Sequence, residues 1–179
     1  TLSNCSEAGI YVNDASPTLR KIVATDALSL NNSGVKVTGT SSNPLIQYIT
    51  VTNTEYGINI DGSSSDAVVD YCSLASTNTN ANVRVNSNGY VCLAGPGLNG
   101  NNIIYPSSSG YAVKNQSGTS VYAQNNWWGG VPQASYFTGT VDYSNYLGSP
   151  PNAGSQYGKI AVLYDDPFIL EENGRYAEA

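Results

Sequence analysis

Four residues that could contact a ligand recur at nearly constant intervals along the chain: Tyr11, Lys36, Asn59 and Arg84. Each stands between two aliphatic residues, and the residue two positions further on is again polar, Asp61 being one example. Tyr can stack on the face of a sugar, Lys and Arg can pair with uronate carboxylates, and Asn and Asp can bind hydroxyl groups. This pattern predicts a surface stripe able to follow an extended polysaccharide or a cell-surface glycan.

The same stripe also fits a simpler role, that of a solvated sheet face with interspersed charges, since Asp61 falls between Lys36 and Arg84. Catalysis would need more acidic residues than the stripe offers. A lyase calcium site takes several carboxylates and a glycosidase takes a suitably spaced pair. Asp61 has no acidic neighbour in the adjacent repeats, and Asp66 suits the turn that it flanks. We therefore expect no catalytic residues and no cofactor, with calcium as the one ion that such a face could attract.

Composition excludes several other functions. The net charge is −6 with only seven Lys and Arg residues, which argues against the clustered basic face that nucleic acids require. The chain has no His, so it cannot build a His-based triad or a His-ligated zinc site. No apolar run approaches the length of a membrane span. Charged residues make up only 11%, and the abundance of Asn, Ser, Thr and Tyr is typical of an extracellular protein.

Strand-like stretches accompany the stripe. Their starts are separated by 25, 23, 25 and 28 residues: 9–13, 34–38, 57–61, 82–86 and 110–115. The first four alternate apolar and other residues, the period of a strand with one buried face, whereas the register of the fifth is open. A second set of apolar stretches follows the first: 17–24, 44–51, 67–74, 100–104 and 123–128.

Repeats of this kind must stack, because one repeat cannot bury its own apolar face. Turn-rich runs separate the stretches, and no helical pattern precedes the last part of the chain. The sequence therefore predicts an all-β solenoid of about five to six rungs, each about 4.8 Å above the last. Its strands are expected to be parallel.

Over roughly residues 1–150 this repeat resembles the right-handed parallel β-helix repeat family, the pectate-lyase-like solenoids of secreted and surface bacterial proteins. The resemblance implies a right-handed coil and a bacterial, extracellular or cell-surface setting. In the polysaccharide lyases of this fold, a Lys or Arg base and acidic calcium ligands lie on such a face. Carried over to this sequence, that pattern would make Lys36 or Arg84 the base and Asp61 a cation ligand.

The segment around Asn126, Trp127 and Trp128 resembles the last rung of such proteins, and we expect it to cap the C-terminal end of the core. Trp128 falls in a predicted inward-facing column with four smaller residues: Ala24, Val51, Leu74 and Ile104. Asn126 falls below Asn102, where one side-chain amide can bond to the next. Trp127 is predicted to point outward, where it could contact a ligand.

Three Cys residues lack the spacing of a metal site. Cys5 and Cys72 share a predicted column with Ile22 and Ile49, so they would lie three rungs and about 14 Å apart, too far for a disulfide. We interpret both as small buried residues, whereas Cys92 could be buried or accessible. The Asn-x-Ser/Thr sequences at Asn4, Asn31 and Asn115 are attributed to chance.

The chain changes character after residue 151. Residues 1–151 form the predicted β-helix, and residues 152–179 form a linker and a short helical tail, or the start of a further domain. We therefore expect a non-catalytic extracellular module of a larger surface or secreted protein, acting as a rigid spacer or as a glycan-contacting adhesive surface. The alternatives are a fragment of a carbohydrate-active enzyme, either a polysaccharide lyase or a glycoside hydrolase, and an assembly subunit that stacks through its solenoid end.

Overall fold

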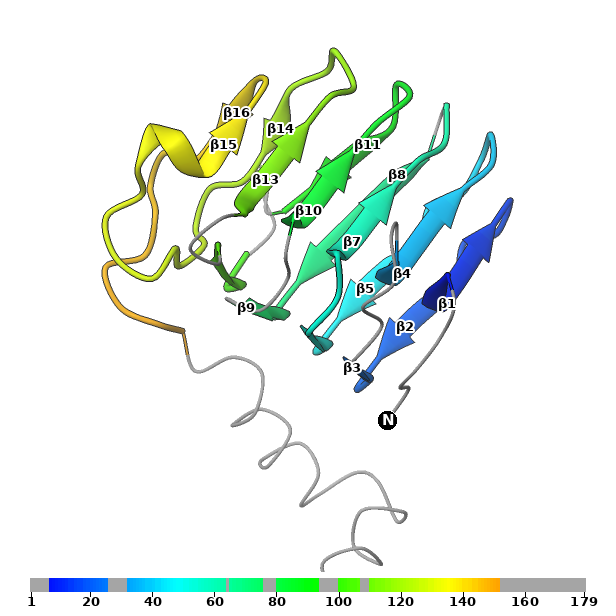
Figure 1. The fold of residues 1–179 in the computed structure, drawn as a ribbon, viewed down its shortest axis with the longest axis horizontal. Helices are drawn as coiled ribbons and strands as arrows, with labels where there is room; N and C mark the ends of the chain where they lie inside the picture. The colour runs from blue at the N-terminus through cyan, green and yellow to red at the C-terminus, as the bar shows by residue number, and fades with distance from the viewer. Residues whose placement is uncertain are drawn as a thin grey trace, which may run out of the picture.

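The protein is a parallel β-solenoid in which three sheets run along a common axis (Figure 1). The computed structural model describes residues 7–25, 32–63, 65–75, 80–93, 100–106 and 110–151. Within these ranges the only helix is one 3-10 turn, η1 (Ala134–Tyr136). The predicted tail at 152–179 and the positions of Asn4, Cys5 and Asn31 lie outside the described residues.

Each of the first four turns adds one strand to each sheet in order, and the strands that follow extend the first and second sheets only. The first sheet contains β1 (Ala8–Asn13), β4 (Ser33–Thr38), β7 (Tyr56–Ile60), β10 (Ala81–Val85), β13 (Tyr111–Asn115) and β15 (Phe137–Thr138). The second sheet contains β2 (Thr18–Arg20), β5 (Leu45–Gln47), β8 (Asp66–Asp70), β11 (Tyr90–Cys92), β14 (Val121–Tyr122) and β16 (Val141–Asp142). The third sheet contains β3 (Val23–Thr25), β6 (Thr50–Thr52), β9 (Ser73–Ala75) and β12 (Ile103–Tyr105). The predicted all-β parallel solenoid is confirmed. It has about four turns with a strand in every sheet rather than the predicted five to six rungs, because the later strands belong to the first and second sheets only.

The register of the first sheet is the one that the repeat spacing predicts. Tyr11 pairs with Lys36, Lys36 with Asn59, and Asn59 with Arg84. The structure also fixes the register of the fifth stretch, which the sequence left open: Arg84 pairs with Lys114. The polar stripe therefore continues by one more turn than the sequence indicated.

The second set of stretches, predicted as single strands, is in fact divided between two sheets. A residue with positive φ stands at the bend between the second and third sheets in every turn: Lys21, Tyr48, Tyr71, Asn101, Asn125 and Asn145. These residues have φ between 53° and 60°, the left-handed region that turns the chain sharply. In the fourth turn the predicted stretch 100–104 supplies only the third-sheet strand, while the second-sheet strand is β11.

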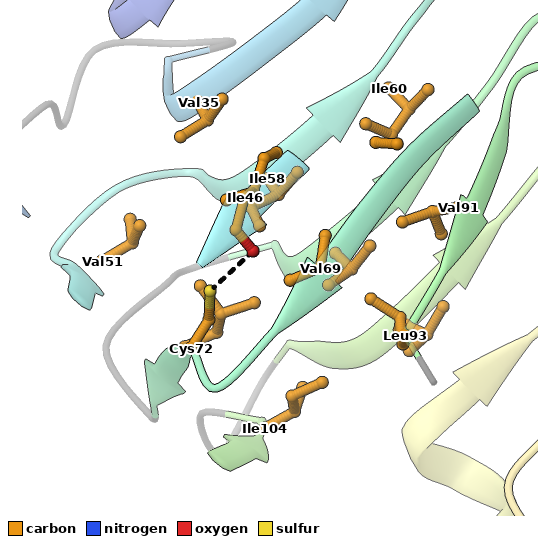
Figure 2. Close-up of a cluster of buried hydrophobic side chains, with 14 of the residues drawn as sticks. Val35, Ile46, Val51, Ile58, Ile60, Val69, Cys72, Val91, Leu93 and Ile104 are labelled. Carbon is orange, nitrogen blue, oxygen red and sulfur yellow. Dashed lines mark hydrogen bonds between the residues drawn. The ribbon is translucent and has the colours of Figure 1, made fainter. Parts of the chain in front are cut away.

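Aliphatic side chains from all three sheets fill the interior of the solenoid (Figure 2). The inner column of the third sheet is the predicted one: Ala24, Val51, Leu74, Ile104 and Trp128, all at most 1% exposed. Cys72 is fully buried and Cys92 is 7% exposed, and both carry reduced thiols. Burial raises the pKa of the Cys72 thiol to about 12, so this thiol is neutral at ordinary pH.

Two buried amides replace aliphatic side chains just after the bend in later turns. Asn126 Oδ1 accepts hydrogen bonds from the Asn102 backbone N–H (3.0 Å) and from Asn102 Nδ2 (2.9 Å). Asn102 Oδ1 in turn accepts a bond of 2.7 Å from the Cys72 backbone N–H. The contact predicted between Asn126 and Asn102 is therefore present.

Aromatic side chains gather at the C-terminal end of the core. Trp128 is 1% exposed and meets Phe137 edge to face at 5.0 Å between ring centroids. Phe137 stacks on Tyr143 at 4.2 Å. Trp127 is half-buried on the outer side of the third sheet, where it forms an isolated bridge with Ile103. Because the last turn has only two-residue strands, β15 and β16, these rings supply much of the apolar surface that covers the end of the core.

Candidate functional site

The outer face of the first sheet brings four of the predicted ligand-contacting residues into one column, with Asp61 just beyond the end of β7, and the five differ in accessibility. Tyr11 is 54% exposed, whereas Asn59 is only 2% exposed. Lys36, Arg84 and Asp61 are half-buried. Asn59 Oδ1 has no hydrogen-bond partner among the described residues, although it lies between Lys36 and Arg84 in the sheet. Asn59 is therefore a buried residue of the stripe. The longer side chains on either side of it form the accessible surface.

Each cation of the column lies over a Tyr ring. Lys36 Nζ is 5.6 Å from the centroid of the Tyr11 ring, and it also forms a salt bridge of 2.6 Å with Glu7. The Tyr11 hydroxyl accepts a hydrogen bond of 3.1 Å from Thr38 Oγ1. These contacts hold the lysine along the sheet surface, within the range of a cation–π interaction.

Two later turns also place a cation over a Tyr ring, but from another strand position: Tyr11 is the strand partner of Lys36, whereas Tyr56 and Tyr111 both pair with Ala81. The Arg84 guanidinium lies 5.0 Å from the Tyr56 ring centroid, and Lys114 Nζ lies 5.9 Å from that of Tyr111. Arg84 Nε donates a bond of 3.3 Å to Gln116. The face thus presents three Tyr–cation pairs, which we call the Tyr–cation face: Tyr11–Lys36, Tyr56–Arg84 and Tyr111–Lys114.

A small polar network joins the second and third of these pairs. Asn80 Nδ2 donates to the Tyr56 hydroxyl and to Glu55, each at 3.1 Å, and Asn80 Oδ1 accepts a bond of 3.1 Å from Lys114 Nζ. Burial raises the pKa of the Tyr56 hydroxyl, and the nearby Arg84 charge opposes that rise in part. Tyr56 therefore remains a neutral phenol that anchors the network.

Sequence reasoning missed Lys114, Tyr56 and Tyr111. Lys114 carried a signal, because placing Val113 inward in the irregular stretch 110–115 puts Lys114 outward. For the two Tyr residues the signal in the sequence was weaker. Each stands three residues before the outward position of its strand, and only the spatial register places it beneath a cation of its own or the next turn.

Asp61 is held by two neutral hydrogen-bond donors. Its Oδ1 accepts bonds from Asn86 Nδ2 (3.1 Å) and Ser87 Oγ (3.2 Å). In the part of the chain that the structure describes, no group of three or more His, Cys, Asp or Glu residues could hold a metal ion. The carboxylate cluster that a lyase calcium site requires is thus not assembled around Asp61.

The carboxyl group with the clearest pKa perturbation lies on a different sheet. Asp70, at the end of β8, is 8% exposed, and burial raises its pKa. Gln47 bonds to Asp70 and also accepts bonds of 2.9 and 2.6 Å from the Arg20 guanidinium. Asp66, at the other end of β8, is about 13 Å away along the strand. That distance exceeds the carboxylate separations of glycosidases, which reach about 9.5 Å.

The Asn-x-Ser sequence at Asn115 is part of the fold. Asn115 is 5% exposed, and its Nδ2 donates to the carbonyl groups of Thr119 (2.6 Å) and Thr140 (2.8 Å). An acceptor for N-glycosylation has to project its amide from the surface. The structure therefore assigns Asn115 to stabilising the turn after β13, in agreement with a chance match to the sequence pattern.

Among the described residues, no helix is both long enough and apolar enough to cross a membrane. Comparison with known proteins adds no family to the fold. No protein-family model matches this chain, and neither a curated protein nor a solved structure matches it significantly.

Proposed function

We propose that this chain is a non-catalytic β-solenoid module of a larger secreted or cell-surface protein, related to the pectate-lyase-like solenoids, and that its Tyr–cation face is an adhesive surface for acidic glycans. The observation that carries the proposal is that three turns of a single sheet each hold a cation over a Tyr ring. Tyr11 is 54% exposed and Tyr56 only 5% exposed, so the contacts common to the three pairs are their cations. Successive turns are about 4.8 Å apart, so a chain-like ligand can meet these cations along the axis.

The chemistry of the face suits sugars that carry carboxylates. Exposed Tyr11 offers a flat apolar surface for a sugar ring, and the Lys36, Arg84 and Lys114 side chains offer charged donors for uronate groups. Glu7, Glu55 and Asp61 border the column and lower its net charge. Affinity for each sugar unit is therefore expected to be weak and dependent on salt. Multiple contacts along an extended chain would compensate for weak single contacts.

Two features support a binding role rather than a catalytic one. Asp61 is bonded to Asn86 and Ser87, and the described part of the chain places no carboxylate cluster around it. Lys36 Nζ is engaged in a salt bridge of 2.6 Å with Glu7. The alternative of a lyase or hydrolase fragment receives no comparable support from the described residues.

The test is calorimetric titration with polygalacturonate, alginate and neutral dextran, while unsaturated uronate products are followed by ultraviolet absorbance. We expect binding of the two polyuronates without product, and weaker binding as salt is raised. A variant with Lys36→Ala, Arg84→Ala and Lys114→Ala together should bind polyuronate about tenfold or more weakly.

Arg20→Ala is the matched control. Arg20 is an exposed cation on the second sheet, bonded to Gln47, and its loss changes the net charge without touching the Tyr–cation face. If Arg20→Ala weakens binding as much per charge as the triple variant, the interaction is non-specific and the proposed site is wrong. Absence of polyuronate binding would leave the role of a rigid spacer, and release of unsaturated product would overturn the non-catalytic assignment.

A further inference from the structure

A hollow of about 370 Å³ lies at the bend between the second and third sheets, away from the Tyr–cation face. It is lined by Tyr71, Asn101 and the exit segment 147–151: Leu147, Gly148, Ser149, Pro150 and Pro151. Its size is near the lower end of the range of ligand pockets, about 300–1,000 Å³.

The two Tyr residues nearest this hollow occupy an unusual position. Tyr48 and Tyr71 stand in the column of left-handed residues at the bend, with φ of 55° and 53°. The following turns place Asn there, the residue that adopts this conformation most readily after Gly. Tyr pays a steric penalty at such a position, so its presence in two successive turns requires a compensating contact.

Part of the compensation is visible as an aromatic stack. The rings of Tyr48 and Tyr71 are nearly parallel, with centroids 5.2 Å apart and 15° between their planes. Along the axis the order of the column is Tyr48, Tyr71, Asn101, so the hollow that Tyr71 and Asn101 share lies on the side of Tyr71 that faces away from Tyr48. The stack thus supports Tyr71 from behind as one wall of the hollow.

The chemistry of the lining defines the ligand. The lining combines the apolar side chains of Tyr71, Leu147 and two Pro residues with the polar side chains of Asn101 and Ser149. None of the seven lining residues is charged. A neutral pyranose ring has the matching form, because its C–H face is apolar and its hydroxyl groups lie at its edge. We propose that this hollow, the Tyr71 site, binds a ring of a neutral saccharide, independently of the Tyr–cation face.

Saturation-transfer NMR and calorimetry with maltotetraose and cellotetraose test the site. Tyr71→Asn is the informative variant, because Asn fills the same left-handed position at 101, 125 and 145 and should leave the fold intact, as circular dichroism would verify. We expect one or both saccharides to bind at millimolar concentration and Tyr71→Asn to weaken that binding about tenfold or more. Tyr71→Phe, which keeps the ring, should retain most of the affinity.

Tyr122→Ala is the matched control, because Tyr122 is 39% exposed on the second sheet and does not line the hollow. Equal binding by Tyr71→Asn and the unchanged protein would overturn the proposal, as would binding of neither saccharide. A proline-rich peptide that binds at Tyr71 when the saccharides do not would also overturn it, in favour of a peptide site. The triple variant of the Tyr–cation face should bind the neutral saccharides normally, which separates a failure of this site from a failure of the proposed function.

Discussion

The two halves of the solenoid core fill equivalent positions with different chemistry. Just after the bend, the early turns place Ile22 and Ile49 inward, whereas the late turns place Asn102 and Asn126 there. The inner column of the third sheet changes too, from Ala24 in the first turn to Trp128 in the last. Opposite that column, the first sheet has Gly9, Gly34 and Gly57 in the early turns and Asn82 and Ala112 in the late ones.

The difference shows two ways of stabilising one bend. An aliphatic side chain adds apolar burial but offers nothing to the backbone groups that the bend exposes. An Asn side chain buries less apolar surface, yet it satisfies these groups: Asn102 Nδ2 donates to the Val69 carbonyl (3.0 Å) and Asn126 Nδ2 to the Leu93 carbonyl (2.6 Å). The early half therefore depends on close packing, and the late half on a connected amide network.

Trp128→Ala should have the largest effect, because within the described ranges Trp128 is the largest buried side chain and no complete turn follows it. Truncation of a buried Trp costs about 3–5 kcal/mol. Urea unfolding followed by far-ultraviolet circular dichroism would measure the loss. The half-buried Trp127 provides the control, and Trp127→Ala should cost clearly less. Equal losses would show that Trp128 is not the main support of the C-terminal end.

Asn102→Leu converts a late turn to the chemistry of the early ones. It leaves the Cys72 N–H and the Val69 carbonyl without their Asn102 side-chain partner and removes one of the two hydrogen bonds to Asn126 Oδ1, which keeps the bond from the backbone N–H of residue 102. Buried polar groups that lose a partner cost about 1–3 kcal/mol each. We expect a total loss of about 2–4 kcal/mol after the gain in apolar burial. Hydrogen exchange gives a local readout, because the Cys72 amide should lose its protection first. Unchanged protection of that amide would contradict the network interpretation.

Gly34→Ala tests the close packing of the early half. A Cβ at Gly34 would lie 2.9 Å from the Gly57 carbonyl oxygen and would overlap Val51 Cγ1. Overpacking of this kind costs about 1–3 kcal/mol. In a double-mutant cycle, Val51→Ala should recover part of the loss, since it removes the overlapping methyl group but not the contact with the carbonyl. Additive losses in the cycle would show that Val51 is not the limiting contact.

The strand register and the burial of Trp128 could be predicted because period-two alternation at a fixed spacing decides which residues face inward. The bend between the second and third sheets could not be predicted, since Tyr48 and Tyr71 adopt left-handed φ without the Gly or Asn that signals a turn. Strand β11 was missed because the sequence AGPGLNG at 94–100, which follows it, lengthens this repeat and breaks its alignment with the others. The Tyr–cation face was predicted only in part, because the pairing of Tyr56 with Arg84 depends on contacts between turns.

Cys72 lies where the two halves meet, and its thiol occupies the place of an Asn amide. Its Sγ donates to the Ile46 carbonyl at 3.5 Å (Figure 2), and Ile46 is the strand partner of Val69, which accepts the equivalent bond from Asn102. A second, shorter contact of 3.3 Å reaches the Asp70 carbonyl. The thiol sulfur also receives a backbone hydrogen bond from Ile49, as Asn102 Oδ1 does from Cys72. Cys72 is therefore a weak first member of the amide network.

This interpretation predicts opposite outcomes for two substitutions of similar size. Cys72→Asn should extend the network by one turn and remain within about 1 kcal/mol of the unchanged protein, because its amide finds the same carbonyl and N–H groups. Cys72→Val keeps the apolar volume but removes the donor and the acceptor, and should cost about 1 kcal/mol. Urea unfolding of both variants tests whether Cys72 belongs to the close-packed half or to the amide network. If Cys72→Val is as stable as the unchanged protein and Cys72→Asn is strongly destabilised, the position belongs to the close-packed half, and the amide network begins at Asn102.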